Sequence, residues 1–231
     1  MEKRKSRKVN YTVCSTPDKP LVYVLRGENG DMLIDTGTDT TAPHIEKWIE
    51  ESGFDIKWIF LTHGHFDHAY NAGYFRKKYG AKLMLHEKDL ELFRGLTIQS
   101  VNLSPGYNAD VSELYNTIVS SHNPVCDVDV LITDDDADYL RKIGFDAEIV
   151  MFPGHTDGSM GIKQGRVVYC GDACAAKGGD YYTSLFGSDI DLLLDSEKKI
   201  FSLDPLVIAP GHGKLIINER AFPTKNEKGR G

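Results

Sequence analysis

Short apolar runs separated by turn residues recur along most of the chain. Such runs predict β-strands, because a buried strand needs about four to eight apolar positions and ends where glycine, proline or asparagine lets the chain turn. The predicted strands cover residues 11–14, 21–25, 32–34, 58–61, 82–85, 128–132, 147–152, 160–162, 167–170 and 206–209.

Other stretches place apolar residues at the three- and four-residue spacing of an amphipathic helix. In 41–52, for example, Ile45, Trp48 and Ile49 share one face, and Gly53 is a typical helix stop. The predicted helices cover 41–52, 69–79, 87–94, 111–119 and 190–202. Two successive sets of strands, each followed by helix, predict two sheets packed face to face with helices outside.

The pattern loosens between Gly95 and Asp127, where prolines and glycines interrupt it. A connection this long in a compact domain is functional or mobile, so we interpret 95–127 as a lid or insertion that forms much of a binding pocket. No linker divides the chain, and we expect a single domain over 1–231. The basic residues at 1–8 precede no apolar stretch, which favours a frayed terminus over a signal peptide.

The overall charge narrows the class of partner. The 231 residues carry a formal net charge of −7, which argues against general affinity for nucleic acid or anionic membranes and favours a small-molecule partner. No apolar run approaches the roughly 18 residues of a membrane span. The four cysteines show no disulfide-framework spacing, so we expect reduced thiols and a cytoplasmic setting.

The strongest chemical signal is the run His63-Gly64-His65-Phe66-Asp67-His68, placed where a buried strand gives way to a helix. Imidazole and carboxylate are the usual ligands of zinc and related divalent ions. Alternation in an extended turn points the first two histidines the same way, while Asp67 and His68 come from the first helical turn. This short loop can therefore direct two sets of ligands into one cleft.

Three further polar residues, His155, Asp172 and His212, each stand at or near the end of an apolar run. Each has a glycine next to it, which lets the backbone turn sharply and approach a site closely. In this order the motifs resemble the metallo-β-lactamase superfamily, specifically its branch similar to hydroxyacylglutathione hydrolases and lactone hydrolases. The resemblance covers about 11–217 and implies an α+β fold, a four-layer αββα sandwich.

The resemblance also implies two divalent metal ions, most simply Zn²⁺, with iron or manganese as alternatives. The implied ligands form two sets with a shared carboxylate: His63, His65 and His155 for one ion, Asp67, His68 and His212 for the other, and Asp172 bridging them. Asp35, which follows the strand at 32–34, would orient the metal-binding loop without binding an ion itself.

The implied activity is hydrolysis. A hydroxide held between the two ions would attack an ester, thioester or lactone carbonyl, with Asp67 orienting the nucleophile and carrying its proton. Lys177, Tyr181 and Tyr182 follow Asp172 in the region from which related hydrolases recognise substrate. The chain nevertheless has Ala175 where a tyrosine stands in that branch, and it lacks a basic cluster suited to glutathione.

Two other functions stay open on the sequence. One is an iron-dependent oxidoreductase of the same fold acting on sulfur or oxygen, because histidine and aspartate do not select zinc over iron. The other is a non-catalytic metabolite-binding protein, which would not need a complete ligand set. Cys170 and Cys174 flank Asp172 and are interpreted as small residues filling a tight corner, with a redox role as the alternative.

Overall fold

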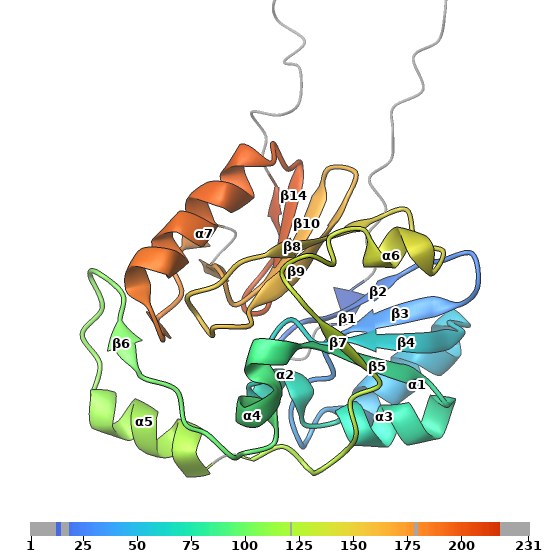
Figure 1. Ribbon diagram of the computed structural model, residues 1–231, viewed down its shortest axis with the longest axis horizontal. Coiled ribbons are helices and arrows are strands. Elements are labelled where there is room, and N and C mark those ends of the chain that lie inside the picture. The colour runs from blue at the N-terminus through green and yellow to red at the C-terminus, as the bar shows by residue number, and fades with distance from the viewer. Residues whose placement is uncertain (1–12, 15–18, 121, 178–179, 218–231) are drawn as a thin grey trace, which may run out of the picture.

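Two β-sheets face each other (Figure 1). A shared layer of apolar side chains lies between them. The computed structural model describes residues 13–14, 19–120, 122–177 and 180–217. The first sheet has the order β1 (Val13–Cys14), β2 (Val22–Leu25), β3 (Asp31–Ile34), β4 (Ile56–Phe60), β5 (Lys82–His86) and β7 (Val130–Ile132). The second has the order β15 (Ile216–Ile217), β14 (Val207–Pro210), β10 (Val167–Gly171), β9 (Met160–Gln164) and β8 (Glu148–Met151).

Side-chain alternation along these strands divides the apolar residues into three layers. Between the sheets, Tyr23 and Tyr169 meet edge to face with their ring centroids 5.2 Å apart, and the hydroxyl of Tyr23 donates to the carbonyl of Pro210 at 2.7 Å. A second apolar cluster lies between the first sheet and its helices, and a third between the second sheet and its helix. The predicted αββα sandwich is confirmed.

Helices cover both outer faces (Figure 1). The first sheet is covered mainly by α1 (Ala42–Ser52), which buries Ile45 and Ile49, and by α3 (Ala72–Tyr79), which buries Phe75. The second sheet is covered by α7 (Ile190–Ser202), whose first turn is capped by Asp189. The shorter helices are α2 (Phe66–Ala69), η1 (Glu87–Asp89), α4 (Leu90–Phe93), α5 (Val111–Ser120) and α6 (Tyr139–Lys142).

The prediction of one helix over 69–79 is wrong, because α2 and α3 are separate helices. The side chain of Asn71 lies at the break and donates to the carbonyls of Thr36 and Thr38 at 2.8 and 2.7 Å. These bonds tie the start of α3 to the loop after β3. Residues 1–12 lie outside the described part of the chain, and with them the predicted frayed segment 1–8.

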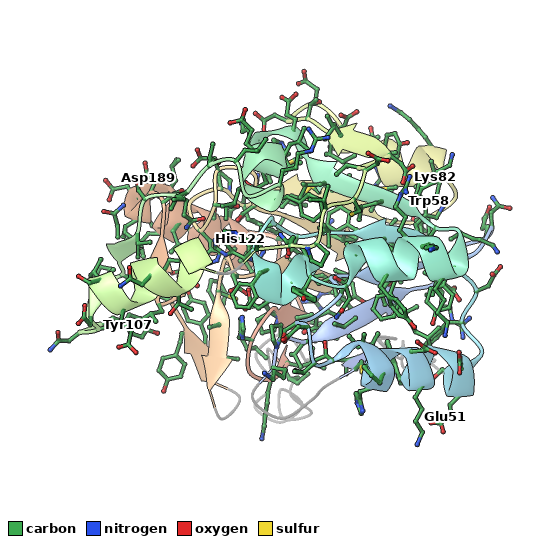
Figure 2. All side chains as sticks on the ribbon, turned by 90° about the horizontal axis from the view of Figure 1, so that it is seen from below. Glu51, Trp58, Lys82, Tyr107, His122 and Asp189 are labelled. Atoms are coloured by element: carbon green, nitrogen blue, oxygen red, sulfur yellow. The ribbon has the colours of Figure 1, made fainter. Side chains whose placement is uncertain are left out.

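The 95–127 segment contains the predicted helix at 111–119, which is α5, and one element that the sequence does not predict. That element is β6 (Asn102–Leu103), which pairs with β13 (Phe186–Gly187). Figure 2 shows Tyr107 and His122 at the two ends of α5, with His122 on the side nearer the sheets. A last hairpin, β11 (Ala175–Lys177) and β12 (Asp180–Tyr182), follows the second sheet's β10. Among the described residues, no helix combines the length and apolar character needed to cross a bilayer.

Candidate metal centre

Parallel strand pairs bring the predicted ligands to one edge of each sheet. β3 and β4 run parallel, so Asp35 and the loop beginning at His63 emerge side by side. β10 and β14 also run parallel, so Asp172 and His212 emerge side by side from the second sheet. His155 follows β8 of that sheet. The two edges face each other, and seven residues from four loops therefore meet.

His63 turns the lone pair of Nε2 to the centre because its Nδ1 donates a hydrogen bond elsewhere. The hydroxyl of Thr62 donates to Oδ2 of Asp35 at 2.9 Å, so its oxygen is left to accept from Nδ1 of His63 at 3.0 Å. The proton of His63 is thus on Nδ1. Its Nε2 is fully buried and has no hydrogen-bond partner, an arrangement that costs about 1–3 kcal/mol unless a ligand satisfies the atom.

His65 and His155 are fixed in the same way. His155 donates from Nδ1 to the carbonyl of Phe186 at 2.9 Å, and His65 has Nε2 2.7 Å from Oε1 of Gln99. The remaining nitrogens, Nε2 of His155 and Nδ1 of His65, lie 3.0 Å apart. Two neutral imidazoles with facing lone pairs repel each other. A metal ion bound between them would accept both lone pairs and remove that repulsion.

A second group meets beside the first. His68 donates from Nδ1 to Oδ2 of Asp35 at 2.9 Å and turns Nε2 towards Nε2 of His212, 3.2 Å away. Oδ2 of Asp67 lies 3.2 Å from the same His212 nitrogen. Asp35 therefore contacts the ligand loop at Thr62 and His68, the place that the sequence predicts for an orienting residue. Its backbone has a φ of 60°, rare for a non-glycine residue.

Asp172 lies between the two groups. Its Oδ2 is 3.6 Å from Nε2 of His155 and 3.4 Å from Nε2 of His212, while its Oδ1 is 3.3 Å from Nε2 of His68. Oδ1 is buried and makes no hydrogen bond of good geometry. A carboxylate in this position can bind one ion with each oxygen.

Three subsets of these residues bring one ligand atom each to within 4.8 Å of one another. They are His63, His65 and His155; His63, His68 and Asp172; and Asp67, His68 and His212. The first and third subsets correspond to the two predicted ligand sets. The donor chemistry, the facing lone pairs and the unpartnered buried atoms all fit divalent ions.

The pKa values of the histidines differ between the two groups. Burial lowers the pKa values of His63, His65 and His155, the last to about 4, so that this group is neutral and ready to bind a cation. Burial opposes protonation of His68 too, but the surrounding Asp172, Asp67 and Asp35 raise its pKa well above the usual range.

The exposed members of the site mark its open side. The side chain of His212 is 39% exposed and that of Asp67 is 25% exposed, whereas the first group is buried. Although burial acts to raise it, the pKa of Asp67 is held at about 2 by His68 and by the hydrogen bond with His212. Asp67 is therefore an ionised carboxylate at the mouth of the site.

Gly211 shows why the sequence has glycine beside these ligands. A Cβ atom built at Gly211 would lie 2.1 Å from Oδ1 of Asp172 and 2.6 Å from Cε1 of His68. No real side chain tolerates such contacts. The backbone directly after β14 therefore approaches the site as closely as the predicted role of glycine requires.

Asp89 is a residue of the site that the sequence does not reveal. Its buried carboxylate accepts from the amide of Gly64 at 2.8 Å, from the amide of Gly158 at 2.8 Å and from the hydroxyl of Thr156 at 2.7 Å. Gly64 separates His63 from His65, and Thr156 follows His155. One side chain thus joins the two loops that carry the first group.

The residues predicted to contact the substrate do not share one surface. The ring of Tyr181 packs on Phe201 of α7, with centroids 4.9 Å apart, and its pKa is raised by burial and by its hydrogen bond to Glu197. Tyr182 lies on the opposite face of the β11–β12 hairpin and is exposed. The backbone of Lys177 belongs to β11, but its side chain lies outside the described part of the structure. Tyr181 is therefore a packing residue of the α7 interface.

Cys170 and Cys174 are free and buried, with their sulfur atoms 3.4 Å apart. The hydrogen bond with Cys170, together with burial, raises the pKa of the Cys174 thiol well above its usual range. A thiol with a raised pKa is a poor nucleophile. The pair fits the interpretation as small residues filling a corner behind Asp172.

Comparison with known proteins fits this geometry. A sequence model of the metallo-β-lactamase superfamily matches residues 15–212, a span that includes all seven predicted ligands. The chain belongs to the metallo-β-lactamase superfamily. Hydroxyacylglutathione hydrolase GloC of Haemophilus influenzae is 28% identical over 210 residues, 87% of this chain and 90% of that protein. The probable metallo-hydrolase YqgX of Bacillus subtilis is 26% identical over 85% of this chain and 86% of its own length.

Two solved structures share the fold. TTHA1623 in a di-iron-bound form is 23% identical, with a TM-score of 0.65 over 93% of this chain and 99% of that one. The B3 metallo-β-lactamase BLEG-1 is 24% identical, with a TM-score of 0.65 over 90% and 94%. The predicted family and fold are confirmed, and this member of the metallo-β-lactamase superfamily is a metal-dependent hydrolase.

Proposed function

We propose that the chain is a binuclear hydrolase that cleaves the ester, thioester or lactone bond of a small molecule. The observation that supports this most is the convergence of three histidines that each have one ring nitrogen already hydrogen-bonded. The three neutral imidazoles of the first group turn lone pairs to one point, while a second group with three carboxylate or imidazole ligands adjoins it through Asp172.

Two ions bound by these groups would polarise a carbonyl and make water nucleophilic near neutral pH. The protein's own contribution lies in Asp67. This carboxylate is ionised, lies 3.2 Å from His212 Nε2 and is partly exposed on the open side. It is therefore placed to orient a water molecule through a hydrogen bond and to accept its proton. Asp35 and Asp89 hold the ligand loops still while this happens.

We infer that zinc is the working metal. Three neutral imidazoles and a carboxylate form a ligand set typical of zinc. Iron binds similar ligands, and the related TTHA1623 structure contains two iron ions. Loading the metal-stripped chain separately with zinc, iron and manganese, followed by rate measurements, separates these alternatives. The free cysteines accord with a cytoplasmic location, which we also propose.

The open side suggests where the substrate enters. The amide of Ala176 in β11 donates to the carbonyl of His212 at 3.2 Å, so the β11–β12 hairpin borders the exposed edge of the site. Tyr182 and Lys177, both on this hairpin, are the proposed substrate contacts. GloC is named for hydrolysing hydroxyacylglutathione, and a thioester is accordingly the first substrate class to test.

The decisive experiment is a hydrolysis screen of the zinc-loaded protein across thioesters, lactones, β-lactams and phosphodiesters, with Asp67→Asn as a matched variant. Turnover of a carbonyl substrate that depends on Asp67 supports the proposal. An iron-dependent reaction with oxygen or a persulfide, and none with the hydrolytic panel, would favour the oxidoreductase alternative. Tight binding without turnover in any metal form would favour the metabolite-binding alternative.

A further inference from the structure

Gln99 contacts two of the proposed ligands from the 95–127 segment. Its Nε2 donates to the carbonyl of His155 at 2.9 Å, and its Oε1 lies 2.7 Å from Nε2 of His65. The first bond settles the orientation of the carboxamide, because only its nitrogen can face a carbonyl oxygen. Its oxygen therefore faces His65, which must donate from Nε2 and keep its lone pair on Nδ1.

Gln99 is also the point at which its own stretch of chain is attached. Residues 97–101 are all described, and within them Gln99 alone hydrogen-bonds to another residue. The neighbouring Ile98 and Ser100 are exposed. Polar attachment of this stretch to the sandwich thus passes entirely through the two metal-ligand loops.

Gln99 also lines a polar cavity of about 510 Å³, bounded in addition by Asp89, Thr156 and Asp157. Asp89 and Thr156 belong to the hydrogen bonds that join the ligand loops. Gln99 therefore stands between this cavity and the buried face of His65. Loss of its side chain would remove the hydrogen bond that holds the His65 ring.

We propose that Gln99 is a positioning residue that fixes His65 for the first metal ion and, reciprocally, that metal binding holds residues 97–101 against the site. The inference rests on the proposed function only for the presence of a metal in the first group. Coupling of this kind is symmetric in free energy. If the Gln99 contact strengthens metal binding by some factor, metal binding strengthens the contact by the same factor.

The test uses Gln99→Leu, which keeps the bulk and removes both hydrogen bonds, and Gln99→Glu, which keeps an acceptor for His65 but loses the donor to His155. Ser100→Ala is the matched control, since it lines the same cavity without a hydrogen bond. Zinc affinity is measured by competition with a chromogenic chelator, and the backbone order parameters of 97–101 are measured by nuclear magnetic resonance relaxation with and without zinc. Thermal unfolding of the zinc-free proteins checks the fold.

Gln99→Leu should bind one of its two zinc ions about 10–100-fold more weakly, the usual effect of losing a partner that orients a ligand. Zinc should raise the order parameters of 97–101 in the wild type and in Ser100→Ala but not in Gln99→Leu. Gln99→Glu should restore most of the affinity. It also serves as the second variant if Gln99→Leu does not fold.

Two results would overturn the inference. One is a zinc affinity and a zinc-dependent rise in the order parameters of 97–101 that are the same in Gln99→Leu as in Ser100→Ala. The other is a folded Gln99→Glu as weak as Gln99→Leu, because the His65 acceptor would then be irrelevant. Neither readout requires turnover. A protein that shows the coupling but hydrolyses nothing in the screen would support this inference and contradict the proposed function. A protein that hydrolyses a substrate but shows no coupling would support the proposed function and contradict this inference.

Discussion

Replacing Asp89 by Asn tests whether one buried carboxylate joins the two ligand loops. Oδ2 accepts from the amide of Gly64 and the hydroxyl of Thr156, and Oδ1 accepts from the amide of Gly158. Asparagine is nearly the same size but has one acceptor oxygen. With that oxygen in the place of Oδ2, its NH₂ group faces the amide of Gly158, donor against donor.

The expected cost follows from these contacts. A hydrogen bond to a charged group contributes about 1.5–3 kcal/mol, and a buried donor left unpaired costs about 1–3 kcal/mol. Asp89→Asn loses one such bond outright and weakens two others, so we expect the free energy of unfolding to fall by about 2–4 kcal/mol. Thr156→Val removes a single hydroxyl contact and should cost less, about 1–2 kcal/mol.

Urea unfolding of the zinc-free proteins measures this cost. The exposed Asp135, whose carboxylate accepts no hydrogen bond, provides the control Asp135→Asn, expected within about 0.5 kcal/mol of the wild type. Zinc affinity should also fall in Asp89→Asn, because the loops of His63 and His155 are no longer tied. A fall in the free energy of unfolding of less than about 0.5 kcal/mol, with the same slope of that free energy against urea concentration, would refute the reasoning.

Three further outcomes follow from the site. Asp67→Asn should lower turnover of the substrate found by the screen by about 10²–10⁴-fold with an unchanged circular dichroism spectrum; near wild-type turnover would show that Asp67 is not catalytic. Gly211→Ala should displace Asp172 and reduce zinc bound per chain, measured by elemental analysis; full zinc content would contradict the close approach. Burial lowers the pKa of His155 to about 4, whereas Asp172 raises that of His212, so protons compete for His212 at higher pH. Zinc should therefore leave in two steps as pH falls from 7, with the ion at His212 lost first; simultaneous release would contradict this order.

The ligand motifs are visible in the sequence because local rules produce them. His63, Asp172 and His212 each stand where an apolar run ends beside a glycine, and parallel pairing then brings such ends to one edge. The same local rules place α1, which has a proline in its first turn and Gly53 with a φ of 66° at its end. Strands and helices of this kind need no information from distant residues.

The residues that the sequence does not reveal act through distant partners. Asp89 bonds to residues 25, 67 and 69 positions away, and Gln99 reaches residues 34 and 56 positions away. Nothing near either residue signals these contacts. The break at Asn71 has the same origin, since its partners lie in the loop after β3. Tyr181 and Tyr182 lie in different surroundings because adjacent residues of a strand face opposite sides, an alternation that their prediction as joint substrate contacts did not take into account.

Counting zinc ions bound per chain tests the central claim most directly. The wild-type protein, loaded with zinc and freed of excess metal, should hold about two ions, as a centre with two ligand sets and a bridging carboxylate requires. His212→Ala should hold about one, because the first group of histidines stays complete. A single ion in the fully loaded wild type, or no change in His212→Ala, would contradict the binuclear centre.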